Sequence, residues 1–191
     1  MKPFPRPGVS LLITMKTIPT LLVSVGLLVS AAAMHAAEKT EKSDAKPSPV
    51  SVNFFQPEKF MDVRDSMMGS DKGRDAILEE LRRFITTRAE PLLPPGHTLS
   101  LTFLDVDLAG DYEFWRGPNM QDVRIVKDIY PPRFLFRFVI KDDAGKVLKE
   151  GERRLTDLGF MQRLTIDRQD PLRYEKDLLG DWLRSELRRK R

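Results

Sequence analysis

A strand, a turn and a second strand between Phe134 and Leu155 constrain the fold more than any other part of the chain. Phenylalanines occupy positions 134, 136 and 138, and Ile140 continues the series. A period of two is typical of a strand with one buried face. The turn residues Asp142–Lys146 follow, and a second extended segment begins at Val147. Because a short turn joins only antiparallel strands, this hairpin predicts a mainly antiparallel sheet.

Other segments show extended patterns as well. Val50–Phe54 and Thr98–Leu108 place apolar residues at alternate positions, which predicts two strands. Val123–Tyr130 is expected to be a further extended segment, interrupted by Pro131-Pro132. Tyr112–Gln121 is expected to be a loop.

Two helices are predicted from apolar residues at helical spacing. The first begins near Gly73, with Ser70 or Asp71 as its cap, and Pro91 ends it. The second follows Asp170-Pro171, a suitable N-cap and first-turn pair. Their apolar stripes are Ile77, Leu78, Leu81, Phe84 and Ile85 in the first helix, and Tyr174, Leu178, Leu179, Trp182, Leu183 and Leu187 in the second.

These patterns predict a single α+β domain over residues 50–187. Its sheet is mainly antiparallel, with about four to five strands, and two helices pack on one face of the sheet. The patterns leave the pairing order of the strands open.

The first 37 residues have the layout of a secretory signal peptide. Basic residues precede a short apolar run, and small residues follow it up to Ala37. Cleavage is expected after Ala33, Ala36 or Ala37, and Met15 is a possible true start. A charged leader with two prolines, residues 38–49, then precedes the fold. The expected location is the periplasm of a Gram-negative bacterium, or outside the cell, with no stable membrane span after signal removal.

The net charge of +4 depends largely on this N-terminal segment. The chain has 32 basic and 28 acidic residues, and removal of residues 1–37 leaves 29 basic against the same 28 acidic. The remaining positive charge gathers at the C-terminus, where residues 188–191 form a basic tail. A nearly neutral exported domain argues against a nucleic-acid partner.

Four blocks of residues carry a resemblance to a known family. They are residues 50–66, with Asp62-Val-Arg-Asp-Ser66; Leu104–Gly110; Asp122–Arg133; and Pro171–Lys176 with Asp181-Trp182. Through them the chain resembles the exported bacterial proteins of domain of unknown function 3016. The resemblance implies one exported bacterial domain, and it supplies no activity, cofactor or catalytic residue.

Composition and motifs exclude several classes of chemistry. The chain has no cysteine and only two histidines, so disulfides, thiolate metal sites and cysteine nucleophiles are absent. It contains no glycine-rich nucleotide loop and no zinc-protease motif. We therefore expect no cofactor, and we lean against catalysis.

Three groups of residues are candidate sites. Asp105, Asp107 and Asp111 are candidate oxygen ligands for Ca²⁺ or Mg²⁺, with hydrogen bonds to backbone or arginine as the alternative. Tyr112, Phe114 and Trp115 form an aromatic cluster that either anchors a partner or folds back over the sheet. The third group is a basic surface that either caps the helix dipole or contacts an anionic envelope component, and it comprises Arg184, Arg188, Arg189, Lys190 and Arg191.

Three functions follow from these sites. The preferred one is a non-catalytic periplasmic binding protein that contacts an envelope protein or another envelope component through a sheet edge or the aromatic loop. The first alternative is a metal-binding protein or metal-assisted hydrolase that uses the acidic cluster. The second is a carrier of a small apolar ligand held between sheet and helices.

Overall fold

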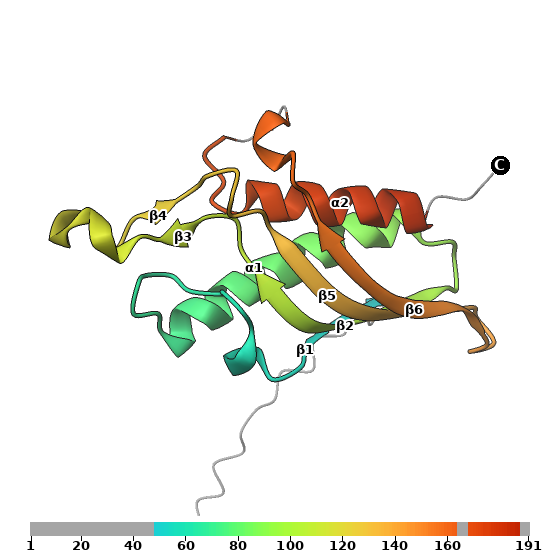
Figure 1. The fold of residues 1–191 in the computed structure, drawn as a ribbon. Helices are drawn as coiled ribbons and strands as arrows, with labels where there is room; N and C mark the ends of the chain where they lie inside the picture. Colours follow the sequence, from blue (N-terminus) through green and yellow to red (C-terminus); the bar gives the residue numbers. More distant parts are fainter. Residues whose placement is uncertain (1–47, 164–167, 188–191) are drawn as a thin grey trace, which may run out of the picture. The chain divides into compact units, whose positions relative to one another are not determined.

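A four-stranded sheet with the order β1-β2-β5-β6 forms the centre of the fold (Figure 1). The computed structural model describes residues 48–163 and 168–187. The predicted signal peptide, residues 38–47 of the predicted leader and the basic tail lie outside the described residues. The elements are β1 (Val50–Phe54), α1 (Asp71–Ala89), β2 (Thr98–Asp107), β3 (Asp111–Tyr112), β4 (Arg124–Ile125), β5 (Arg133–Lys141), β6 (Val147–Thr156) and α2 (Arg173–Leu187).

The predicted fold class is confirmed. The pairs β2–β5 and β5–β6 are antiparallel, and β3 and β4 form a separate two-stranded antiparallel sheet. The pair β1–β2, whose order the sequence left open, is parallel, with Val52 opposite Leu101. Helix α1 connects these two strands because parallel neighbours require a crossover connection.

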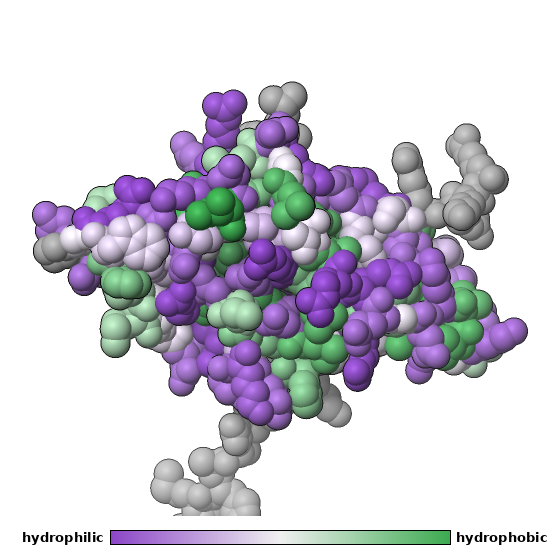
Figure 2. Space-filling model, in the orientation of Figure 1, coloured by the Kyte–Doolittle hydropathy of each residue, from purple (hydrophilic) through white to green (hydrophobic). Residues whose placement is uncertain are grey.

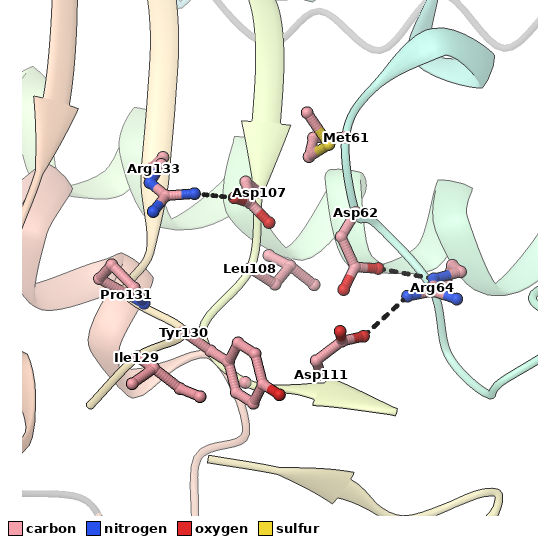
Figure 3. Close-up of a pocket in the computed structure, with 11 residues that line it drawn as sticks. Met61, Asp62, Arg64, Asp107, Leu108, Asp111, Ile129, Tyr130, Pro131 and Arg133 are labelled. Atoms are coloured by element: carbon pink, nitrogen blue, oxygen red, sulfur yellow. Dashed lines mark hydrogen bonds and ion pairs between the residues drawn. The ribbon is translucent and has the colours of Figure 1, made fainter. Parts of the chain in front are cut away.

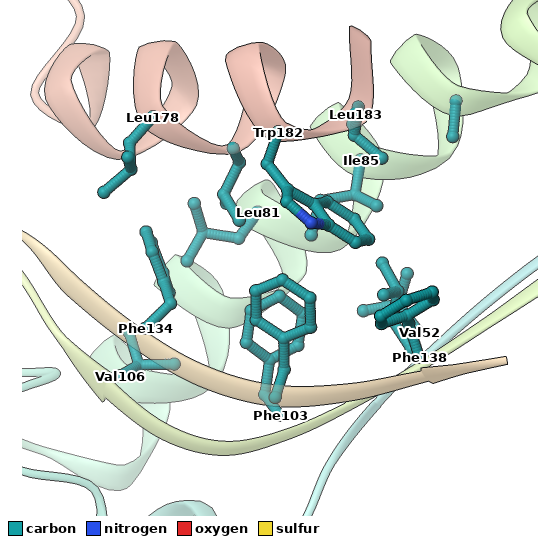
Figure 4. Packing of buried hydrophobic residues seen from close by; sticks show 14 of the residues in the cluster. Val52, Leu81, Ile85, Phe103, Val106, Phe134, Phe138, Leu178, Trp182 and Leu183 are labelled. Atoms are coloured by element: carbon teal, nitrogen blue, oxygen red, sulfur yellow. The ribbon is translucent and has the colours of Figure 1, made fainter. Parts of the chain in front are cut away.

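One face of the sheet carries the core. Phe103, Phe134 and Phe138 point from the strands toward the two helices, as Figure 4 shows, and Phe136 is buried in the same cluster. Trp182 of α2 packs edge to face on Phe136 and Phe138, with ring centroids 4.7 and 5.5 Å apart. The other face of the sheet is mainly polar, although Leu135 and Val139 of β5 lie half-buried on it. The alternation of apolar and polar residues in the sequence therefore separates the core face from the solvent face.

A β-bulge between Phe103 and Asp105 resets the alternation of β2. Asp105 lies opposite Leu135, and Val106 lies opposite Phe134 in the core. The extra residue, Leu104, therefore turns both Asp105 and Asp107 to the outer face. Without the bulge, the side chain of Asp105 would face the helices.

Helix α1 begins at its predicted cap, whereas α2 begins at Arg173, two residues after Pro171, the predicted first helical residue. The Ser70 hydroxyl accepts the N–H of Gly73 at 2.9 Å and caps α1. Asp170 accepts the N–H of Leu172 at 2.8 Å in the turn that leads into α2. No helix in the described part of the chain is long and apolar enough to cross a membrane.

The chain between β2 and β5 differs from the sequence prediction. Only Arg124–Ile125 of the expected extended segment Val123–Tyr130 forms a strand. It pairs with Asp111–Tyr112, so Tyr112 belongs to a strand at the start of the expected loop. Residues 110–130 form an excursion from the main sheet, here called the arm (Figure 1). Contacts of buried Asp62 with Arg124 fix this pairing, and the local pattern does not contain them.

The free edge of β1 is partly occupied by side chains of this chain. The Ser48 hydroxyl accepts the N–H of Val50 at 3.1 Å. The Arg82 Nε of α1 donates to the carbonyl of Val52 at 3.2 Å. Two of the outward backbone groups of this edge are therefore already hydrogen-bonded.

Candidate functional site

Two pockets lie at the base of the arm. The Asp107 pocket has a volume of about 300 Å³, and Figure 3 shows Asp107 and Arg133 on one side of it and Arg64 and Asp111 on the other. The Glu175 pocket has a volume of about 390 Å³ and lies where α1, α2 and the end of β2 meet. Arg64 and Leu108 line both pockets.

A buried ion-pair network separates the two pockets. Asp62 follows β1 and is held beside β2, since its N–H donates to the carbonyl of Val106 at 3.2 Å. Arg124 of β4 forms two hydrogen bonds with the Asp62 carboxylate, at 2.9 and 3.1 Å. Arg64 donates its Nε to the same carboxylate at 2.8 Å. Burial alone raises the pKa of Asp62, but hydrogen bonds from Arg124 and Arg64 outweigh it and hold that pKa below its usual range.

Tyr112 lies against the guanidinium groups of this network. The guanidinium carbon of Arg124 is 4.7 Å from the centre of the ring, and that of Arg64 is 5.5 Å away. The phenol also donates to the carbonyl of Arg64 at 3.4 Å. Tyr112 is 7% exposed, so it joins the arm to the body of the protein and is not part of an open aromatic surface.

The three predicted acidic ligands are each hydrogen-bonded to another group. Asp107 accepts from Arg133 at 3.1 Å, and Asp111 accepts from Arg64 at 3.1 Å (Figure 3). Asp105 accepts the backbone N–H of Met61 at 2.8 Å and does not line the Asp107 pocket. Burial raises the pKa of Asp107, with the charge of Arg133 opposing the shift.

Metal binding by these carboxylates stays a prediction. Within residues 48–163 and 168–187, no group of three or more His, Cys, Asp or Glu side chains is arranged to hold a metal ion. Arginine is the main partner of Asp107 and Asp111, which was the alternative that the sequence left open.

The tip of the arm carries the other two predicted aromatics. Phe114 is 62% exposed and Trp115 is 61% exposed. Their rings pack edge to face on each other, with centroids 5.1 Å apart and an angle of 83° between the planes. The structure therefore separates the predicted cluster into one buried and two exposed members.

Glu113 anchors the arm directly below this tip. Its side chain is fully buried and accepts from Lys127, Arg116 and the hydroxyl of Tyr130. Hydrogen bonds from Lys127 and Arg116 lower the pKa of Glu113 to about 2. The carboxylate stays charged at physiological pH and links the two sides of the arm.

Glu175 has a different environment. It lies in the first turn of α2 and is 1% exposed. Its Oε1 accepts the N–H of Ala109 at 2.6 Å, whereas its Oε2 has no hydrogen-bond partner among the described residues. Burial raises the pKa of Glu175 to about 7, although the N–H of Ala109 opposes the shift.

Only one member of the predicted basic surface lies in the described chain. Arg184 pairs with Asp181 on the same exposed side of α2. Arg188, Arg189, Lys190 and Arg191 lie outside the described residues.

Asp62, Arg64, Arg124 and Glu175 line or join these pockets although no motif in the sequence marks them as site residues. Each belongs to one of the blocks through which the chain resembles a known family, and the blocks meet around the two pockets. That convergence is the signal that could have found them. Arg124 lies 60 residues after Arg64, and Glu175 lies a further 51 residues along the chain, so only the fold brings these residues together.

The sheet and the helices define an α+β domain whose helices cover one face of the sheet, with two of its pockets at the base of the arm. The chain belongs to the family described as "Protein of unknown function (DUF3016)", whose family model matches residues 48–185. A search of curated proteins and a search of solved structures each found no match.

Proposed function

We propose that this protein is a non-catalytic binding protein of the bacterial periplasm that contacts an envelope protein through the tip of its arm. The observation that carries the proposal is the pair Phe114 and Trp115, which are exposed side by side at the tip. Tryptophan and other large aromatics are enriched among the residues that contribute most to binding at protein interfaces.

The base of the arm supports this role. Arg124 and Tyr112 hold one end of the excursion against the body, and Glu113 joins its two sides. An anchored base lowers the conformational entropy that a partner must remove on binding. The two aromatic rings are thus presented on a supported element.

The orientation of the rings favours a protein surface over a sugar. A sugar stacks on the flat face of an aromatic ring, whereas Phe114 and Trp115 are nearly perpendicular, at 83°. The pair forms a compact apolar knob that suits a pocket on another protein.

Elsewhere the surface offers less for such a contact. The view in Figure 2 shows mainly polar residues with apolar side chains in separate groups. One exposed apolar pair, Val147 and Leu148, lies on β6 beside charged neighbours. Export to the periplasm is supported by the layout of residues 1–37. The absence of cysteine, the presence of only two histidines and the lack of a nucleotide-binding or zinc-protease motif support a non-catalytic role.

The test is chemical cross-linking in cells that produce the full chain, followed by mass spectrometry. Trp115→Ala is compared with Leu158→Ala, which removes another exposed apolar side chain, 76% exposed, outside residues 110–130. We expect at least one envelope protein to be cross-linked in the wild type and in Leu158→Ala, and to be lost in Trp115→Ala. If the two variants give the same cross-linked proteins as the wild type, the arm is not the binding site.

A further inference from the structure

Glu175 lines the Glu175 pocket, and one oxygen of its carboxylate has no hydrogen bond from the described residues. Oε1 of Glu175 accepts the N–H of Ala109 at 2.6 Å, and Oε2 has no such partner. The residue is 1% exposed, so bulk water does not replace the missing donor. A buried acceptor without a donor is costly, and native proteins usually satisfy such groups.

The neighbouring cation is already occupied. Arg124 lines the same pocket, but its two terminal nitrogens donate to Asp62, to the carbonyl of Gly110 and to the carbonyl of Arg64. It therefore contributes positive charge near Glu175 while its terminal nitrogens donate to other groups. The donor that would complete Oε2 has to come from elsewhere.

The rest of the pocket is mainly apolar. Ile77 of α1, Leu108 after β2 and Leu172 before α2 contribute apolar walls, and Ala76 lines the pocket from the exposed side of α1. The volume of about 390 Å³ lies within the range of about 300–1,000 Å³ that is usual for small-molecule sites. An apolar cavity with a few convergent polar groups is the usual composition of such a site.

The charges select a neutral guest. Glu175, Asp65 and Glu80 line the pocket with carboxylates that an anion would meet, and a cation would approach the guanidinium groups of Arg64 and Arg124. We infer that the Glu175 pocket binds a small, neutral, mainly apolar molecule that donates one N–H or O–H group to Oε2 of Glu175. This site is independent of the tip of the arm and of the partner proposed for it.

The probe for the test is N-phenyl-1-naphthylamine, which is neutral and apolar, carries a single N–H donor and fluoresces more strongly in apolar surroundings. We expect saturable binding to the purified protein. Glu175→Gln keeps the size of the side chain and an acceptor for Ala109, but it places an amide N–H₂ where Oε2 was. This exchange should weaken binding about tenfold, the effect of one lost buried hydrogen bond. Glu150→Gln, on the exposed side of β6, should bind as the wild type does.

Two further comparisons separate the hydrogen bond from general apolar binding. The N-methylated probe lacks the donor, so it should bind the wild type and Glu175→Gln equally. Ala76→Trp places a large side chain at an exposed helix position that lines the pocket, and it should abolish binding. Ala144→Trp, in the hairpin turn, should not.

Melting curves and circular dichroism establish that each variant is folded. The proposal is overturned if the wild type shows no saturable binding, or if folded Glu175→Gln and Ala76→Trp bind the probe as the wild type does. Neither result depends on whether a protein contacts Trp115.

Discussion

Asp62 and Glu175 show how differently two buried carboxylates of one chain are stabilised. Asp62 has two arginine partners and stays charged, because their hydrogen bonds offset the cost of burial. Glu175 has backbone N–H groups but no cationic side chain as hydrogen-bond donors, so burial dominates and raises its pKa to about 7. The first carboxylate connects the arm to the body, and the second leaves a group in a pocket that changes its protonation near neutral pH.

The raised pKa of Glu175 predicts a specific dependence of stability on pH. The unfolded carboxyl titrates near 4.5 and the folded one near 7, so the native state binds the extra proton between these values. Compared with a variant that lacks this group, the protein should therefore have its highest free energy of unfolding below the unfolded pKa. That free energy should fall as the pH rises from the unfolded pKa through the folded one, by on the order of 3 kcal/mol in total.

Urea unfolding of the wild type and of Glu175→Gln from about pH 5 to about pH 8 measures this contribution. The neutral glutamine lacks it, while the groups with lowered pKa values, such as Asp181 and Glu80, act in both proteins alike. The unfolding free energy of the wild type should therefore fall relative to that of Glu175→Gln as the pH rises. A difference that is constant across this range would contradict the prediction.

At the scale of single residues, the sequence identified polar candidates but not their partners. Asp107 and Asp111 do line a pocket, as two acids near the end of a strand suggest. Arg64, which pairs with Asp111, lies 47 residues away in the chain. No local pattern contains such a pairing, and the same is true of Glu175 and Ala109, which are 66 residues apart.

Helices α1 and α2 each contain a glycine, and the two positions should respond to alanine in opposite ways. At Gly180 a Cβ would meet Arg184 and Phe84 at 3.5 and 3.6 Å, which is ordinary contact. Gly180→Ala should therefore stabilise the protein by roughly 0.5–1 kcal/mol, the usual gain within a helix. At Gly73 a Cβ would lie 2.0 Å from Cγ and 2.6 Å from Cβ of Asp65.

Gly73→Ala should accordingly destabilise the protein by roughly 1–3 kcal/mol, because Asp65 and its backbone must move. The displacement also disturbs the hydrogen bond from Ser70, the helix cap, to Asp65. Thermal unfolding of both variants measures the two signs. Asp65→Gly removes the obstructing side chain and should restore the stabilising effect of alanine at 73; if it does not, the clash is not the cause.

At the scale of elements, alternation and helical spacing predicted the main strands and both helices. They did so because these patterns record which side of an element is buried, as in β5 with its row of phenylalanines. The two-residue strands β3 and β4 are too short to show an alternating pattern of apolar and polar residues. Tertiary contacts to Asp62 and Tyr112 decide their pairing, and the parallel neighbour of β2 likewise depends on the crossover through α1.

At the scale of the whole molecule, the proposed export makes a prediction about the mature chain. The protein recovered from the periplasm should lack residues 1–33, 1–36 or 1–37, because cleavage follows a small residue after the apolar run. Leu22→Arg places a charge in that run and should leave the full-length chain inside the cell.

Intact-mass measurement of the fractionated protein tests both statements. Thr40→Arg, in the predicted leader, adds the same charge beyond the cleavage region and should be processed as the wild type is. Recovery of the periplasmic protein with residues 1–33 still attached would contradict the assignment of a cleaved signal.

The occupied edge of β1 has a consequence for how this chain behaves in a crowded compartment. An open edge strand is a template on which other extended chains add, and this route leads both to peptide recognition and to amyloid-like assembly. Here Ser48 and Arg82 already satisfy the N–H of Val50 and the carbonyl of Val52, so an incoming strand would first have to displace them. Helix α1 thus supplies, through one arginine, a safeguard against self-association along that side of the sheet.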